Sequence, residues 1–178
     1  TQFCGGVAIA NAFCNPTGSG RLSGGFSVGG IAIHPTDPNI VLVAARNPSS
    51  NVASGIYRST DGGANFSLLA SASGAPGNSV VFNPTNPLIV YAGLGGFSGG
   101  TASFGIYKST DGGVSFAKLT GTDPTLPTTN IARTEVRISP GTPSTVYAAI
   151  SNATGSALRA FVRTTDDGAT WTVFVPGV

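Results

Sequence analysis

Carboxylate side chains are the first candidates for chemistry in this 178-residue sequence. Two carboxyl groups can hydrolyse a glycoside when they lie about 5–5.5 Å apart in retaining enzymes or about 6.5–9.5 Å apart in inverting ones. The acidic residues are Asp37, Asp61, Asp111, Asp123, Glu135, Asp166 and Asp167. All but Asp123 and Glu135 fall within turn motifs. We therefore assign no catalytic residue and keep Asp123 and Glu135 as candidates. The alternative is a solvated loop aspartate and a glutamate paired with Arg133 or Arg137.

Other routes to catalysis lack a partner residue. A serine or cysteine nucleophile needs a histidine base, and His34 is the only histidine. Its counterparts in the repeats described below are Asn83 and Ser139, which indicates a turn residue. One histidine and no Cys-x-x-Cys spacing predict no metal and no cofactor. The sequence thus favours a protein without enzymatic activity, and glycoside hydrolysis is the activity to test.

Composition bears on compartment and partners. Nine basic and seven acidic residues give a net charge of +2, with no basic stripe for nucleic acid. No apolar run approaches the roughly 18 residues that indicate a membrane span.

Cys4 and Cys14 enclose a short loop, which suits a disulfide in an exported protein; two free thiols are the alternative. The chain contains no Met, which we interpret as a processed mature form or a piece of a longer protein. We expect a secreted, extracellular or cell-surface location.

Internal repeats organise the chain. An apolar segment containing Pro-x-x-Pro begins at Ile31 and recurs at Val80 and Val136. An Asp-Gly turn follows each copy, and its aspartates at positions 61, 111 and 166 are spaced by 50 and 55 residues. Units of about fifty residues are typical of propeller blades.

Each unit reads as four short strands. Proline cannot donate to a β-ladder, so the Pro-x-x-Pro segment predicts a turn between strands. An apolar, β-branched run, a short strand beginning with glycine in the first two copies and a strand after the Asp-Gly turn complete the unit. The prediction is an all-β fold with three blades of four antiparallel strands, at about 31–70, 79–120 and 135–175. Residues 1–30 form an N-terminal arm with a Gly/Ser-rich connector.

The Asp-Gly turns resemble the Asp-box, S-x-D-x-G-x-[TS]-[WF], of bacterial neuraminidase repeats. The matching residues are Ser59, Asp61, Gly63, Phe66, Ser109, Asp111, Gly113, Ser115, Phe116, Thr164, Asp166, Gly168, Thr170 and Trp171. Pairing this box with a Pro-x-x-Pro segment is similar to sortilin-type and xyloglucanase-type propellers. The resemblance implies a propeller in which the box carboxylates are structural. A short carboxylate at a turn accepts backbone N–H hydrogen bonds, and glycine allows positive φ there.

Binding is expected on the loops that follow the second and fourth strands, because these loops vary between copies. The candidates on this face are Arg46, Phe97, Phe104, Arg133 and Arg159. Arginines and aromatics can contact sugar or protein; ordinary surface arginines and packed loop phenylalanines are the alternative.

Three blades are fewer than the roughly 4–8 of a closed propeller. The sequence therefore favours a non-catalytic exported scaffold or interaction module within a larger protein or a multi-subunit assembly. Its partners would be further copies or other blades that complete the array, and a filament is one such assembly. The arm then either adds a strand to a neighbouring subunit or packs on its own chain. The alternatives are the blade-forming part of a secreted glycoside hydrolase and a sugar-binding propeller lectin.

Overall fold

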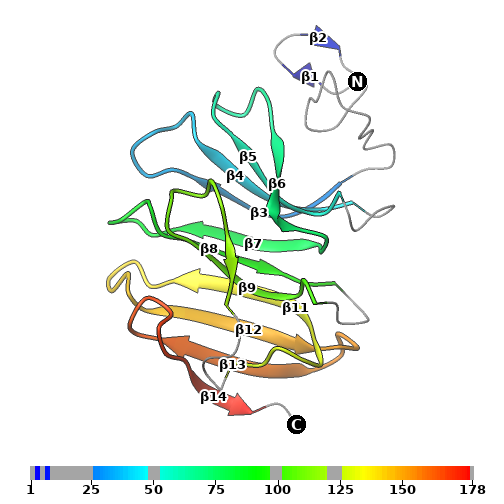
Figure 1. Ribbon diagram of the computed structural model, residues 1–178, viewed down its shortest axis with the longest axis vertical. Coiled ribbons are helices and arrows are strands. Elements are labelled where there is room, and N and C mark those ends of the chain that lie inside the picture. The colour runs from blue at the N-terminus through cyan, green and yellow to red at the C-terminus, as the bar shows by residue number, and fades with distance from the viewer. Residues whose placement is uncertain are drawn as a thin grey trace.

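The computed structural model describes residues 3–4, 7–8, 26–47, 53–96, 102–119 and 126–176. These residues form strands and turns, and no helix occurs among them. Three four-stranded sheets are stacked along the long axis, from an N-terminal sheet at one end to a C-terminal sheet at the other (Figure 1). The predicted all-β fold with three four-stranded antiparallel sheets is confirmed.

We call the sheets blades 1 to 3. Blade 1 consists of β3 (Ser27–Ile33), β4 (Val41–Arg46), β5 (Gly55–Ser59) and β6 (Ser67–Ser73). Blade 2 consists of β7 (Gly77–Phe82), β8 (Val90–Leu94), β9 (Gly105–Ser109) and β10 (Ala117–Lys118). Blade 3 consists of β11 (Ile131–Ile138), β12 (Val146–Asn152), β13 (Leu158–Thr164) and β14 (Thr172–Pro176). Within each blade the strands lie in sequence order. A separate hairpin pairs β1 (Phe3–Cys4) with β2 (Val7–Ala8).

Blade 1 begins earlier than the sequence predicts. β3 starts at Ser27, so residues 27–30 belong to the sheet and not to a connector. Gly29 lies at a register shift in the pairing of β3 with β4, and a Cβ added to it would lie 2.5 Å from the carbonyl oxygen of Asn78. The glycines therefore permit close approach of blade 2, a role that a composition rich in Gly and Ser conceals.

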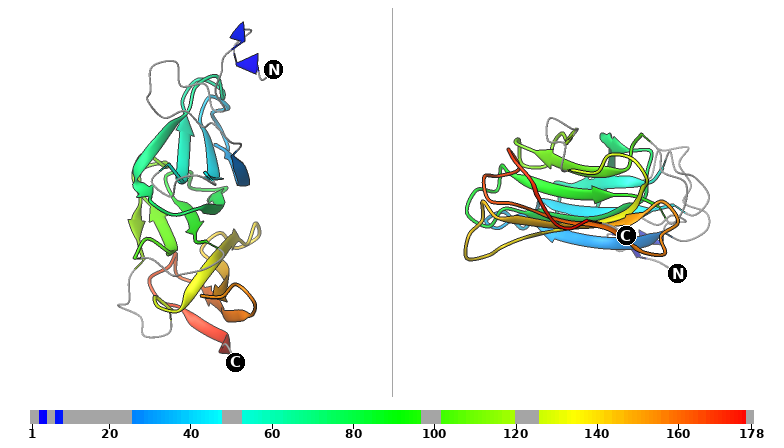
Figure 2. Two further views of the ribbon diagram at one scale, coloured as in Figure 1. Left: turned by 90° about the vertical axis from the view of Figure 1, so that its right-hand side faces the viewer. Right: turned by 90° about the horizontal axis from the view of Figure 1, so that it is seen from below.

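The core lies mainly between the blades. All five residues of β8 are buried, as are the first five of β4. β7 packs against β3 and β4 on one side and against β11 on the other. Figure 2 shows the three sheets as successive layers. A face that would be exposed in an isolated blade is thus buried by the next one, as in repeat proteins generally.

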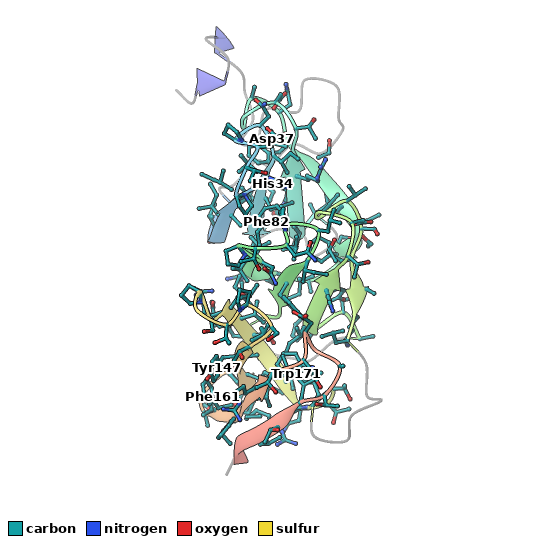
Figure 3. The ribbon with its side chains drawn as sticks, turned by 90° about the vertical axis from the view of Figure 1, so that its left-hand side faces the viewer. His34, Asp37, Phe82, Tyr147, Phe161 and Trp171 are labelled. Atoms are coloured by element: carbon teal, nitrogen blue, oxygen red, sulfur yellow. The ribbon has the colours of Figure 1, made fainter. Side chains whose placement is uncertain are left out.

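The Pro-x-x-Pro turns are braced by the residue before the first proline. His34 Nδ1 accepts hydrogen bonds from the N–H groups of Thr36 and Asp37, at 3.3 and 3.1 Å. In blade 2 the side-chain oxygen of Asn83 accepts the equivalent pair, each at 3.0 Å. The His34 ring also lies 5.2 Å from the Phe82 ring (Figure 3). His34 is a turn residue that also contacts the next blade.

We expect His34→Ala to lower the free energy of unfolding by about 1–2 kcal/mol, because two backbone donors lose their acceptor. His34→Asn should cost less than half as much, since asparagine braces the same turn in blade 2. Urea denaturation followed by circular dichroism measures both. Equal losses for the two variants would mean that the ring contact with Phe82, and not the turn, accounts for the stabilisation.

Candidate functional site

Each Asp-box is a closed hydrogen-bond network around a hydroxyl. Ser59 Oγ donates to Asp61 Oδ1 at 2.7 Å and accepts from the N–H of Gly63 at 2.9 Å. The Asp61 carboxylate accepts from the N–H of Asn65 at 2.9 Å and from its side-chain amide at 2.7 Å. The Ser59 hydroxyl and both oxygens of the Asp61 carboxylate therefore have partners within the turn.

The other two boxes repeat this geometry. The hydroxyls of Ser109 and Thr164 each donate at 2.6 Å to the aspartate two residues later. Their aspartates accept from a backbone N–H and a hydroxyl four residues on, contributed by Ser115 and Thr170. In blades 1 and 2, both residues after the box aspartate are glycines with positive φ. In blade 3 the first of these positions is Asp167, at φ 55°, and Gly168 follows at φ 84°. The box aromatics follow the prediction in two copies: Phe116 and Trp171 are buried, whereas Phe66 is half-buried.

These networks keep the box carboxylates ionised. Hydrogen bonds from Asn65 and Ser59 lower the pKa of Asp61 to about 2. At Asp111 burial raises the pKa, but hydrogen bonds from Ser109 and Ser115 outweigh it and bring the pKa to about 2. Hydrogen bonds from Thr164 and Thr170 lower the pKa of Asp166 to about 2. Such groups suit bracing of a turn better than proton transfer near neutral pH.

These shifts predict acid destabilisation. The pKa of each box aspartate is lower in the folded protein, at about 2, than in an unfolded chain, where it is about 3.9. The stabilisation is therefore complete above about pH 4 and is lost as the pH falls through 2. Thermal unfolding measured between pH 7 and 2 should show this loss. Replacing the three aspartates by Asn should make the decline shallower; an unchanged profile would contradict the assignment.

A recurring contact joins neighbouring blades. The second strand of one blade packs on the glycine that lies two residues after the box aspartate of the next blade. A Cβ added at Gly113 would lie 2.7 Å from Leu42 Cδ1, and one added at Gly168 would lie 3.2 Å from the hydroxyl oxygen of Tyr91. Leu42 and Tyr91 occupy equivalent positions in β4 and β8 and are fully buried. We call this pairing of a second-strand residue with the following box the blade contact.

A cation strengthens the second blade contact. Lys108 Nζ donates to the carbonyl oxygen of Asp167 in the blade 3 box at 2.6 Å. It also lies 5.8 Å from the centre of the Tyr91 ring. A basic residue recurs at this position before each box, as Arg58, Lys108 and Arg163, where a solvated side chain would be the ordinary expectation. The structure instead uses Lys108 to connect two blades.

The outer face of blade 1 is apolar and lacks a preceding blade among the described residues. Ile31 and Ile33 on β3 are 64% and 59% exposed. Their equivalents on β7, Val80 and Phe82, are each 5% exposed because blade 1 covers them. We call this surface, with the nearby Val28, the blade 1 face. Its composition is that of an interface between blades.

The outer face of blade 3 is aromatic and cationic. Tyr147, the equivalent of Leu42 and Tyr91, stacks on Phe161 with ring centres 5.8 Å apart (Figure 3). Phe174 adds a third ring, 6.4 Å from Phe161, and is 48% exposed. The guanidinium of Arg163 lies 4.6 Å from the Phe174 ring centre. We call this surface the blade 3 face.

A groove lies beside these rings. Its volume is about 300 Å³, and its lining includes Arg133, Glu135, Ser151 and Leu158. The Glu135 carboxylate pairs with Arg133 at 2.8 Å and with Arg137 at 3.3 Å. Glu135 is thus held in the ion pairs that the sequence suggested as the alternative to catalysis. Asp123, the other candidate for a carboxyl pair, lies outside the described residues.

The predicted binding residues that the structure describes do not form one surface. Arg133 lines the groove, Arg159 is half-buried on β13 and Arg46 lies on β4, two blades away. The structure buries Phe104, 2% exposed, in the core, so its ring cannot reach a ligand at the surface. Phe97 lies outside the described residues. Phe104 was therefore wrong as a binding residue, because its loop turns its ring inward.

Two further expectations lie outside what is described. They are the pairing of Cys4 with Cys14 and the fate of the arm before Phe26. In the described ranges, no three His, Cys, Asp or Glu side chains gather closely enough to hold a metal ion. The part of the chain that the structure describes contains no helix long and apolar enough to cross a membrane.

Sequence reasoning missed both end faces. For the blade 3 face, the sequence repeats did contain a signal. Glu135 and Arg137 occupy the positions at which β3 has Gly30 and Ala32. Reading each strand position against its equivalents would have marked blade 3 as different on one face only.

No protein-family model matches this sequence, and no curated protein is significantly similar to it. Solved structures do match. An ancestral GH74 enzyme aligns with a TM-score of 0.60 and 22% identity, over 81% of this chain and 18% of that one. A GH74 enzyme from Niastella koreensis aligns with a TM-score of 0.52 and 24% identity, over 84% of this chain and 22% of that one. YCF48 bound to D1 peptide aligns with a TM-score of 0.46 and 18% identity, over 93% of this chain and 46% of that one.

The chain therefore spans about a fifth of the length of the GH74 enzymes that it matches. At these identities the similarity concerns the fold. The three sheets are blades of the β-propeller type, and together they match part of a propeller.

Proposed function

We propose that the chain is a non-catalytic, exported interaction module of β-propeller type that acts within a larger propeller or a multi-subunit assembly. The observation that carries this proposal is the blade 1 face. Ile31 and Ile33 are more than half exposed at positions that a neighbouring blade buries elsewhere in the chain. Exposed apolar surface of this kind marks an interaction site.

The acidic residues support a role without catalysis. The three box carboxylates are occupied by hydrogen bonds within their own turns. Glu135 is engaged by two arginines. Glycoside hydrolysis by a carboxyl pair would therefore require Asp123 and a release of Glu135 from these partners.

The proposed location rests on the two cysteines of the arm. A disulfide between Cys4 and Cys14 would suit an oxidising compartment. Mass spectrometry without reductant tests this pairing, because a disulfide lowers the mass by two hydrogens. Two free thiols in the native protein would remove the main support for export.

The test of the module role is an assay of the purified chain on xyloglucan, other β-glucans and sialosides. We expect no turnover. Turnover that disappears in Glu135→Gln would overturn the proposal and favour the hydrolase alternative. Glu135→Gln is a useful change because it preserves the size of the side chain. Binding on a glycan array without turnover would favour the lectin alternative.

A further inference from the structure

The blade contact leaves one unmatched half at each end of the chain. The box of blade 2 packs on Leu42, and the box of blade 3 packs on Tyr91. Among the described residues, a Cβ added at Gly63 in the blade 1 box would meet only the ring of Phe66, at 3.7 Å, and no second-strand residue. At the other end, the blade 3 face presents Tyr147 without a described box against it. In the part of the chain that the structure describes, the blade 1 box thus has no receiving residue and Tyr147 has no box.

We propose that the partner of the blade 1 face is the blade 3 face of a second copy of this chain, joined head to tail. This inference rests on the proposed function, since it names the neighbour that such a module would bind. Each junction would then repeat the pairing of a second-strand residue with a following box that already occurs twice within the chain. A contact between two different surfaces of the same protein is heterologous, so it produces either a closed ring or an open filament.

Apolar surface supports this pairing. The blade 1 face offers Ile31 and Ile33, and the blade 3 face offers three neighbouring rings, Tyr147, Phe161 and Phe174. Large aliphatic and aromatic side chains are the usual anchors of protein interfaces. Tyr147 and Phe161 lie at the blade 3 end of the stack, far from the blade 1 end (Figure 3).

Charge supports it as well. The described acidic residues in the turns of blade 1 are Asp37 and Asp61, and the lowered pKa of Asp61 leaves it ionised at neutral pH. The blade 3 face and its groove carry three arginines and one glutamate. These four residues are Arg133, Arg137, Arg163 and Glu135. Complementary charge of this kind favours encounter in one orientation.

The existing cation contact indicates how the charges would meet. Lys108 of blade 2 reaches the blade 3 box, and Arg163 occupies the equivalent position on blade 3. In the junction Arg163 would reach the blade 1 box of the next copy, close to Asp61. Arginine is well suited to this place because its planar group both stacks on aromatic rings and donates several hydrogen bonds.

The junction would differ from the internal ones near the first strands. Glu135 and Arg137 are longer than Gly30 and Ala32, which occupy the same positions on β3. The first strands of two copies would therefore lie further apart than β3 and β7 do. The main contact would shift toward the rings of Tyr147 and Phe174, while the arginine stems cover Ile31 and Ile33.

The first part of the test measures association of the intact chain by sedimentation across a wide concentration range. We expect particles at multiples of 17.7 kDa. Ile31→Asp combined with Ile33→Asp should weaken association at least about tenfold, because it places charge in an apolar contact. Both isoleucines are exposed, so the variant should fold. Leu88→Asp is the matched control, since Leu88 is 56% exposed in a turn of blade 2, and it should have no effect.

The second part changes the blade 3 face. Phe174→Asp should weaken association to a similar degree, and Arg163→Glu provides a second variant that leaves the rings in place. The decisive step is mixing. An equimolar mixture of the Ile31/Ile33 variant and the Phe174 variant retains one intact face of each kind, so it should form a pair that neither variant forms alone.

Three results would overturn the inference. The first is a chain that stays monomeric at every concentration. The second is association that the Ile31/Ile33 variant abolishes but the Phe174 variant does not affect, which would indicate two blade 1 faces packed back to back. The third is failure of the mixture to associate. A monomer without glycoside turnover would remove this partner and leave the proposed module role standing. Turnover that depends on Glu135, with association intact, would overturn the proposed module role and leave this partner standing.

Discussion

Gly113→Ala is expected to lower the free energy of unfolding by about 2–4 kcal/mol. The added Cβ would lie 2.7 Å from Cδ1 of Leu42, a fully buried side chain at the contact between blades 1 and 2. Part of the loss is the strain of a non-glycine residue at φ 77°. The rest is overpacking, because the buried Leu42 side chain must shift within the contact between the two blades. Urea denaturation followed by far-UV circular dichroism measures the effect.

Gly63→Ala separates the two causes. Gly63 occupies the same box position at φ 91°, but the nearest atoms to its Cβ are ring carbons of Phe66 at 3.7 Å. This control should show the backbone strain without the clash and cost about 1–2 kcal/mol. Equal losses at the two positions would mean that the blade contact contributes no steric constraint. Trp171 fluorescence, recorded in parallel, reports on the surroundings of the blade 3 box.

Tyr91→Ala should lower the free energy of unfolding still more, by about 3–5 kcal/mol, which is the usual cost of removing a large buried ring. Tyr91 is fully buried, where it packs on the box glycine of blade 3 and lies beneath Lys108. Its loss leaves a cavity between blades 2 and 3. Tyr147→Ala is the matched control, because Tyr147 has the same position in blade 3 and is only partly buried. We expect it to lower the free energy of unfolding by about 1 kcal/mol when measured in dilute solution.

Tyr91→Phe distinguishes packing from hydrogen bonding. The Tyr91 hydroxyl is buried, and no hydrogen-bond partner is described for it. Burial and the nearby Asp167 and Asp166 raise the pKa of this hydroxyl, so it stays protonated. Removing it should leave stability unchanged or raise it by about 1 kcal/mol, because an unpaired buried hydroxyl is costly. A large loss in Tyr91→Phe would instead indicate a hydrogen bond in solution.

The local elements of this fold could be predicted from sequence because their determinants are local. Within an Asp-box the hydroxyl, the carboxylate and the glycine act within five residues of one another, as at Ser59–Gly63. The Pro-x-x-Pro turns are equally self-contained. The hydrogen bond from Ser109 to Asp111 can therefore be predicted from the sequence motif alone.

Contacts between blades could not be predicted in the same way. The bridge from Lys108 to Asp167 and the close approach at Gly29 both depend on which residues of another blade lie opposite. That pairing follows from strand register and from the packing of sheets, neither of which a single sequence position records. The separation of the Asp123 and Glu135 carboxyl groups could not be predicted for a related reason, because it depends on the path of the long connection at residues 120–134.

The burial of β8 on both sides has a consequence for how the molecule opens and closes. Blade 2 cannot unfold without exposing two interfaces, whereas blades 1 and 3 each need to break only one. Amide protons of Val90–Leu94 should therefore exchange with solvent most slowly, and exchange should quicken toward both ends of the stack. During folding, blade 2 would serve as the template on which the outer blades are ordered. Lengthening the array by association would make each end blade an inner one and slow its exchange as well.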